Sequence, residues 1–332
     1  MLLVPMPRAH RTTSVAVADV FSVDTYSGNN SSLTITNGID LAGQGGLVWL
    51  KDRSYAGAGH QLYNTANGVQ KLVSSSSTAG LTGAIASLQT FTSSGFSINN
   101  DYSANASGYT YVGWTFRKAA KFFDVVTYTG TGTTMTVAHS LGSVPGCIFV
   151  KRTNAAGGWL SYHRAAVNPA APADGPEKCQ IILQSTAAVE QSPYWNNTAP
   201  TSAVFTVKGG EATNISSAIY VAYIFAHDAT GIIDCGSYTG NGSGTGPTVT
   251  LGWQPQYVMI KRMDDTGAWY IYDSARSTSN PRINKLLANS DAAEDTADED
   301  VDFNATSFQL KSTAAGINAN TGTYMYMAIK AE

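Results

Sequence analysis

Hydrophobic residues in this chain follow two short-range patterns. In the first, apolar and polar residues alternate at a spacing of two, as in Leu33–Thr36 and Tyr109–Phe116, which is typical of a half-buried strand. In the second, several apolar residues run together, as in Gly46–Leu50 and Tyr324–Ile329, which suits the core of a β-sandwich. Turn residues separate these segments at intervals of ~8–12 residues, and no segment has a convincing helical pattern. The pattern predicts an all-β, antiparallel protein.

One segment of the pattern occurs three times. Each copy has a tyrosine two residues before a glycine, and an apolar strand that ends in lysine follows it; the anchor tyrosines are Tyr26, Tyr128 and Tyr238. They lie roughly 100 residues apart, which is the length of a small domain rather than of a solenoid turn. We therefore expect three tandem antiparallel β-sandwich modules of the jelly-roll type. They are named here repeat 1 (19–120), repeat 2 (121–229) and repeat 3 (230–332), after an N-terminal arm (1–18).

The last strand of each repeat adds a second alignment. A tyrosine in this strand follows an asparagine by six positions, in the pairs Asn105 and Tyr111, Asn214 and Tyr220, and Asn320 and Tyr326. Asparagine side chains bond to nearby backbone groups and tolerate left-handed geometry, so these asparagines are expected in turns. Ligand binding by the asparagines is the alternative.

The composition argues against several classes of function. Charged residues are only 13% of the chain and the net charge is −3, so the basic face of a nucleic-acid-binding protein is not expected. The three cysteines, an odd number without paired spacing, predict neither a disulfide framework nor a zinc site. No cofactor is expected.

The chain shows no targeting or membrane signal. No stretch approaches the ~18 continuous apolar residues of a membrane helix, so membrane insertion is not expected. The apolar start, Met1–Val4, is too short for a signal peptide. We expect synthesis and folding in the cytoplasm, with the arm either docked on a partner or frayed.

A set of ordered motifs recurs with the repeats. In repeat 3 they stand at Tyr238–Asn241, Leu251–Pro255, Ile260–Arg262, Gly267–Asp273, Phe303–Phe308 and Thr323–Ile329. Repeat 1 departs most, because it lacks the proline and has Lys51-Asp52-Arg53 instead of Lys-Arg. The set resembles a module repeated in tail-fibre and other virion proteins of tailed bacteriophages of the cyanophage and marine-phage type. The resemblance implies a structural or attachment role with a lectin-like sandwich, and it carries no catalytic residues.

Aromatic residues at matched positions are the first candidate site. Trp159 and Trp269 stand in the Gly-x-Trp motif, and Tyr162 and Tyr272 follow three residues later. Aromatic rings are platforms for sugars, and they are also the usual core of a sandwich. The recurrence favours a role in the core or between repeats, with glycan binding as the alternative.

An acidic run from Asp291 to Asp302 is the second candidate. Several carboxylates on one loop repel one another, which indicates a solvated loop. Calcium binding through Asp295, Asp298, Asp300 and Asp302 is one alternative, and contact with a basic partner is another.

No constellation for catalysis is evident. The histidines are scattered, and His163 occupies the position that Asn64 and Asp273 hold in the other repeats. A residue needed for acid–base chemistry would not be expected to vary in this way. We expect a protein that is not an enzyme.

These observations favour a bacteriophage virion structural protein of the tail or tail fibre, acting in assembly and in host-surface attachment. The alternatives are a head decoration protein anchored by the arm and a glycan-degrading tail enzyme. The expected partners are other virion proteins, host surface glycan and further copies of the chain. The resemblance implies a homotrimer, the common form of attachment and fibre proteins of such phages. An independent reason to expect association is that Tyr324–Ile329 is apolar on both faces, so that a neighbouring subunit or module must cover one face.

Overall fold

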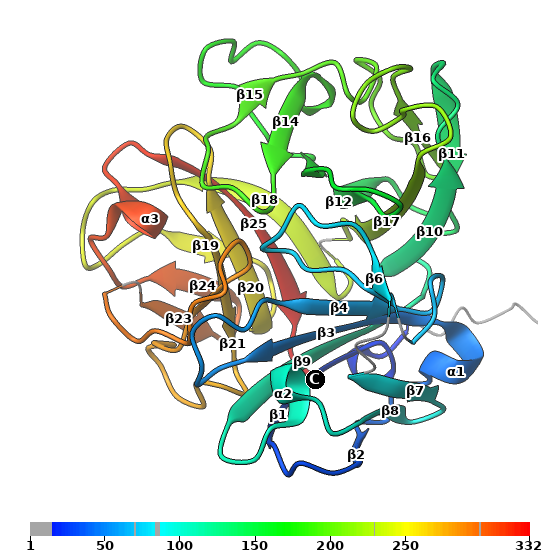
Figure 1. Cartoon of the computed structure of the whole chain (residues 1–332). Helices are drawn as coiled ribbons and strands as arrows, with labels where there is room; N and C mark the ends of the chain where they lie inside the picture. Colours follow the sequence, from blue (N-terminus) through cyan, green and yellow to red (C-terminus); the bar gives the residue numbers. More distant parts are fainter. Residues whose placement is uncertain (1–14, 70, 84–86, 229, 299) are drawn as a thin grey trace, which may run out of the picture.

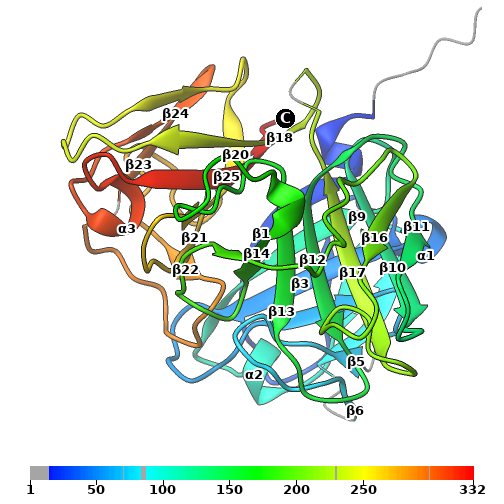
Figure 2. The same ribbon diagram turned by 90° about the horizontal axis from the view of Figure 1, so that it is seen from above.

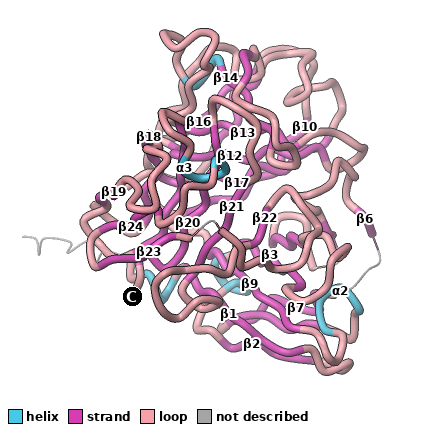
Figure 3. Tube along the Cα trace, turned by 90° about the vertical axis from the view of Figure 1, so that its left-hand side faces the viewer, coloured by secondary structure: helices cyan, strands magenta, loops and turns pink. Residues whose placement is uncertain are grey.

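The all-β prediction is confirmed by a computed structural model, which describes residues 15–69, 71–83, 87–228, 230–298 and 300–332. Antiparallel sheets make up almost all of the regular structure (Figure 1). The described helices are single turns: α1 (Leu41–Gln44), α2 (Tyr102–Asn105), α3 (Ala315–Asn318), and the 3₁₀ turns η1 (Val17–Asp19) and η2 (Pro176–Lys178). In the tube of Figure 3 these helices are short interruptions between strands and loops.

The strands follow the repeat order of the sequence. Repeat 1 contains β1 (Phe21–Ser27), β2 (Leu33–Thr36), β3 (Gly46–Asp52), β4 (Gln61–Asn64), β5 (Lys71–Leu72), β6 (Thr82–Gly83), β7 (Leu88–Thr92), β8 (Gly95–Ile98) and β9 (Thr110–Arg117). Repeat 2 contains β10 (Phe123–Thr129), β11 (Met135–Ala138), β12 (Pro145–Arg152), β13 (Trp159–His163), β14 (Cys179–Ile182), β15 (Glu190–Gln191), β16 (Val204–Val207) and β17 (Ile219–Ala226). Repeat 3 contains β18 (Ile233–Thr239), β19 (Thr248–Thr250), β20 (Pro255–Arg262), β21 (Trp269–Asp273), β22 (Leu286–Leu287), β23 (Val301–Asn304), β24 (Ser307–Leu310) and β25 (Thr323–Lys330).

Each repeat builds its large sheet in the same order. The first strand pairs with the last strand, and the last strand pairs with the strand that carries the lysine. The orders are β1-β9-β3-β4, β10-β17-β12-β13 and β18-β25-β20-β21, with β14-β15 added in repeat 2 and β22 in repeat 3. A smaller sheet accompanies each large one, namely β2-β8-β7, β11-β16 and β19-β24-β23. The shared motifs therefore correspond to a shared strand order.

The anchor tyrosines form one corner in every repeat. In repeat 3, Tyr238 stacks on Tyr324 with ring centroids 5.0 Å apart, and its hydroxyl donates to the Ile317 carbonyl. The buried Asn318 accepts from the Asn241 N–H at 2.9 Å. The same stacks and bonds join Tyr26 with Tyr111 and Tyr128 with Tyr220, and they use Asn105 and Asn214. The asparagines are thus buried ties between the two ends of each repeat.

The alignment with Asn320 and Tyr326 is wrong in repeat 3. The equivalent residues are Asn318 and Tyr324, two positions earlier, because Tyr324 is the residue that pairs with Tyr238. Tyr324 and Tyr326 lie on the same side of β25, since strand side chains alternate with a period of two. Sequence spacing could not distinguish them.

The glycine of the Tyr-x-Gly motif is required by a close backbone approach. A Cβ built on Gly130 would lie 2.2 Å from the Ile215 carbonyl oxygen, and one on Gly240 would lie 2.3 Å from the Ala319 oxygen. No side chain fits there, which explains why this glycine accompanies the tyrosine in each repeat.

Both faces of the large sheets are buried. One face of the repeat 1 sheet packs with its small sheet in a core around Leu50 and Phe96, and repeat 3 has an equivalent core around Ile260 and Phe308. The other faces of all three sheets join one cluster that includes Trp114, Phe225 and Met327 together with many further residues. The repeats therefore share a central core, around which the three groups of strands are arranged (Figures 1 and 2).

The final strand is covered within the chain. Met325 and Met327 are 1% and 2% exposed and belong to the central cluster, while Tyr324 belongs to the core of repeat 3. The other repeats provide the cover that the sequence required, so this strand gives no argument for a second subunit.

Only part of the expected arm lies in the described chain. Residues 1–14 lie outside it, whereas Val15–Ala18 line a mostly apolar depression with Thr230–Ile232 and Lys330–Glu332. The start of the described chain and the C-terminus therefore lie side by side.

Candidate functional site

The matched tryptophans bond to the neighbouring repeat. The indole N–H of Trp159 donates to the Ser74 carbonyl of repeat 1 at 2.7 Å, and that of Trp269 donates to the Ile182 carbonyl of repeat 2 at 3.2 Å. Both side chains are 2% exposed or less. Trp159 also stacks on Tyr223 in the central core. These rings present no open face to a sugar.

Tyr162 and Tyr272 point the other way, because residues three apart on a strand lie on opposite faces. Tyr162 packs edge-to-face against Trp195, and Tyr272 lies in the core of repeat 3. Both are nearly fully buried, so the four predicted aromatic residues form no common platform.

Repeat 1 uses a histidine in the tryptophan position. His60 directly precedes Gln61, which pairs with Leu50, so it stands next in line toward Lys51, at the place where Trp159 pairs with Lys151. Its Nε2 lies 2.9 Å from the Leu287 carbonyl of repeat 3. Its Nδ1 accepts from the Trp49 indole, which leaves the proton on Nε2 for donation to Leu287. Burial lowers the pKa of His60 to about 3, so the ring is neutral. Contacts of this kind run from repeat 2 to repeat 1, from repeat 3 to repeat 2 and from repeat 1 to repeat 3. The three repeats are therefore joined in a closed ring.

Three buried lysines reinforce the ring. Lys51, Lys151 and Lys261 are each 1% exposed or less, and each follows the apolar run of its strand, one residue before the strand ends. Their Nζ atoms donate to the neighbouring repeat at the carbonyls of Asp291 (3.4 Å), Thr78 (2.8 Å) and Thr186 (3.3 Å), respectively. Each also donates to a carbonyl of its own repeat, at Asp52, Gly157 and Arg262. In all three cases burial lowers the lysine pKa to about 8.

The carbonyl segments that receive these bonds also pair through the backbone. Between repeats 1 and 2, the Gly157 N–H donates to Thr78 and the Leu81 N–H donates to Thr153. Equivalent pairs are Gly267 to Thr186 and Val189 to Met263, and Gly57 to Asp291 and Glu294 to Arg53. We call the whole set of indole or imidazole, lysine and backbone bonds the inter-repeat clamp.

The variable position predicted for Asn64, His163 and Asp273 is confirmed by the strand register, because each pairs with the equivalent residue of its sheet. Each also contacts the repeat that follows it in the ring. Asn64 donates to the Tyr223 hydroxyl, His163 Nε2 lies 3.0 Å from the Tyr326 carbonyl, and Asp273 accepts from the Trp114 indole. Burial lowers the pKa of His163 to about 4. Three chemically different side chains thus perform one packing role.

A charged network completes the boundary between repeats 3 and 1. The buried Arg276 bonds to Asp273 at 2.6 Å and to Glu294 at 3.0 Å, and Glu294 also bonds to Arg53 at 2.7 Å. Burial by itself would raise the pKa of Glu294, but the hydrogen bonds and charges of Arg53 and Arg276 hold it below its usual range. Each carboxylate is therefore matched by an arginine, which is the geometry of a structural network rather than of an acid–base pair.

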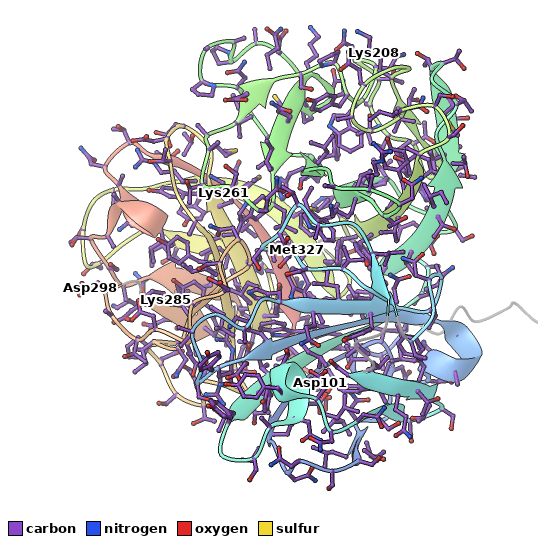
Figure 4. The ribbon with its side chains drawn as sticks, viewed as in Figure 1. Asp101, Lys208, Lys261, Lys285, Asp298 and Met327 are labelled. Carbon is purple, nitrogen blue, oxygen red and sulfur yellow. The ribbon has the colours of Figure 1, made fainter. Side chains whose placement is uncertain are left out.

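The predicted calcium residues are dispersed along the acidic run. Asp295 is more than half exposed and pairs with Lys285, while Asp302 lies 3.9 Å from Lys311. Asp298 and Asp300 line a shallow polar depression with Lys311. In the described ranges, no three histidine, cysteine or acidic residues are grouped so as to hold a metal ion. Figure 4 shows Asp298 at the periphery, whereas Lys261 and Met327 lie among the sheets.

The fold and the clamp define an all-β protein of three joined repeats with a shared core. Residues 16–332 match the family described as a domain of unknown function, DUF7483, and the chain belongs to that family. Among curated proteins no match was found. One similar solved structure is the "Crystal Structure of the STIV MCP", at 8% identity, with a TM-score of 0.19, over 63% of this chain and 95% of that chain. A likeness this low carries no argument.

The described part of the chain contains no helix long and apolar enough to span a membrane.

Sequence reasoning missed the lysines. The Lys-Arg motif was visible in two repeats and Lys51 in the third, but a lysine at a strand end is usually expected at the surface. The signal that identifies a buried lysine here is its recurrence directly after an apolar run in all three repeats.

Proposed function

We propose that this protein is a structural component of a tailed-bacteriophage virion, located in the tail or its fibres, where it acts in assembly and in attachment to the host surface. The observation that carries the proposal is the use of the recurrent residues. The tryptophans, the lysines and the tyrosine–asparagine corners all hold the repeats together or close each repeat. What the three copies preserve is a rigid scaffold, and the ordered motifs resemble those of phage virion proteins.

The geometry also supports a role without catalysis. The buried carboxylates Asp273 and Glu294 are matched by arginines, and the histidines His60 and His163 bond to backbone carbonyls. A cavity of about 10 Å³ between repeats 2 and 3 can hold no more than one water molecule. These features suit a protein that bears load or positions a partner.

Immunogold labelling of purified virus particles tests the proposal. Antibodies against the chain are expected to label the tail or its fibres. Label confined to the head shell would favour the decoration protein, with the N-terminal arm (1–18) as its anchor, and absence of the protein from particles would overturn the virion role. Particles that lack the encoding gene provide the control.

We propose a homotrimer as the assembled form, and this proposal rests on the resemblance because the final strand is already covered. Mass photometry of the purified protein is expected to show three times the 35.0 kDa of one chain. A single species at the mass of one chain would contradict it.

A further inference from the structure

Three tyrosines form a cluster on the outside of repeat 1. The ring centroids of Tyr55, Tyr102 and Tyr109 lie 5.7 Å from one another in every pairing, at interplanar angles of 82°, 85° and 65°. Tyr55 is 39% exposed and Tyr102 is 56% exposed. We call these three residues the tyrosine corner. It lies beside α2, near the labelled Asp101 in Figure 4.

The fold does not need these rings. Tyr109 precedes the last strand at the position of Ala218 and Gly322, because all three carbonyls accept the same bond from the glycine of the Tyr-x-Gly motif. Tyr102 corresponds to Ala315, since their carbonyls accept from the equivalent hydroxyls of Tyr111 and Tyr324, respectively. Tyr55 corresponds to Ala155 and Asp265 by position after the lysine strand. Repeats 2 and 3 form the same tyrosine–asparagine contact and the same inter-repeat clamp without aromatic residues at these positions.

The backbone below the tyrosine corner is held in place. The buried Asp52 accepts from the N–H groups of Ser54 and Tyr55 at 2.8 and 2.9 Å. Ser54 Oγ accepts from the Thr110 N–H, which fixes the residue after Tyr109. Asp101 caps α2 by accepting from the Ser103 N–H, directly after Tyr102. The three rings are therefore presented from a preorganised surface, which limits the entropy cost of binding.

We propose that the tyrosine corner is a carbohydrate-binding site for a neutral pyranose unit. The C–H face of a pyranose can stack on one electron-rich ring face while a second, nearly perpendicular ring closes the side. The phenolic hydroxyls of Tyr102 and Tyr109 bond to each other at 3.4 Å, and each retains capacity for a further bond to a sugar hydroxyl. The neighbouring Asp101 carboxylate can accept from a sugar hydroxyl and disfavours an anionic sugar.

The size of the patch favours a sugar over a protein partner. The exposed parts of the rings add up to on the order of 200–300 Å², because a whole aromatic side chain contributes about 150–250 Å². A stable protein interface needs about 800 Å² from each partner. A few hexose units match the available surface. This site would provide the attachment part of the proposed virion role, but binding by the isolated protein can be measured independently of that role.

Saturation-transfer NMR of the full chain tests the proposal with chitohexaose and maltohexaose as neutral probes and an oligosialic acid as the anionic probe. Transfer to at least one neutral probe is expected, with a Kd on the order of 1 mM. Tyr102→Ala and Tyr109→Ala are expected to weaken binding by tenfold or more. These variants carry the alanines that Ala315 and Ala218 provide in the other repeats, so they are expected to fold. Tyr194→Ala, a half-buried tyrosine of repeat 2, is the matched control.

Several outcomes would overturn the proposal. They are no transfer to either neutral probe, transfer only to the anionic probe, or transfer that persists in Tyr102→Ala. Equal loss in Tyr194→Ala would place binding elsewhere. Sedimentation of the same variants tests a different role for the tyrosine corner. A lower oligomeric state in Tyr102→Ala would assign it to self-association instead of sugar binding.

Discussion

The inter-repeat clamp predicts a specific effect of replacing Trp159 by phenylalanine. The change removes the indole N–H and leaves the half-buried Ser74 carbonyl with its longer bond from the Ser77 N–H, at 3.3 Å. One intramolecular hydrogen bond contributes about 0.5–1.5 kcal/mol net. The smaller ring also leaves a volume on the order of 40 Å³, which adds about 1 kcal/mol at the measured cost of cavities. The free energy of unfolding is therefore expected to fall by about 1.5–2.5 kcal/mol.

Trp195→Phe is a matched control for location. The Trp195 indole is equally buried, but it donates to Cys179 within repeat 2 at 3.1 Å. Urea unfolding followed by circular dichroism should show a loss of stability in both variants. Hydrogen exchange should separate them, because only Trp159→Phe loosens the amides of Leu81 and Gly157, which bond across the boundary of repeats 1 and 2.

The result that refutes the reasoning is equally specific. A Trp159→Phe protein within about 0.5 kcal/mol of the parent would show that the indole bond contributes little, since that is the ordinary scatter of surface substitutions. Exchange at Leu81 that rises equally in both variants would show that stability, and not the clamp, is what changed.

Three further predictions follow from the same contacts. Gly130→Ala should destabilise the protein by about 3 kcal/mol or more in urea unfolding, because its Cβ would meet the Ile215 oxygen, whereas Gly244→Ala has open space and should be nearly neutral. The folded pKa of Lys151, about 8, lies below the unfolded value of ~10.4, so the cost of its buried charge is present below pH 8 and is relieved as pH rises toward 10. The stability difference between the parent and Lys151→Met, measured by urea unfolding at pH 7 and pH 9, should therefore shift in favour of the parent by roughly 1 kcal/mol; an unchanged difference would contradict the shift. The purified protein should release no reducing ends from host surface glycan, and release that is abolished by substitution of one carboxylate would refute the absence of hydrolase activity.

The sequence predicted the strands and the repeat because alternation and turn residues are local properties. It also identified the matching positions of His163, Asp273 and Asn64, which the strand register confirms. It failed at Tyr326, because two tyrosines on one strand face satisfy the same pattern. Loop lengths, which the alternation of apolar and polar residues does not constrain, decide which tyrosine stacks on Tyr238.

The cover of the central sheet faces was beyond sequence reasoning for a different reason. A strand such as Tyr324–Ile329, apolar on both faces, shows that both sides are buried but not by what. Three copies in one chain can cover one another in the same way as three subunits of a homotrimer. In this protein the covalent copies do so, and the ring contacts run from each repeat to both of the others.

The divergence of repeat 1 links the closure of the ring with the proposed carbohydrate site. In repeats 2 and 3 the residue after the lysine is arginine, and Arg152 and Arg262 bond outward to Asn154 and Asp264. In repeat 1 that position is Asp52, and the arginine stands one residue later.

Two consequences follow from this shift. Arg53 pairs across the boundary with Glu294 and completes the network between repeats 3 and 1. Asp52, in place of the arginine, holds the backbone of Ser54 and Tyr55 and sets the position of the tyrosine corner. Replacing Asp52 by asparagine removes its charge but retains an acceptor for the two N–H groups. If Asp52 acts by positioning Tyr55, Asp52→Asn should bind the neutral probe that the parent binds with the same affinity. Asp52→Ala should bind that probe several-fold more weakly, while Arg53 and Glu294 still join repeats 1 and 3.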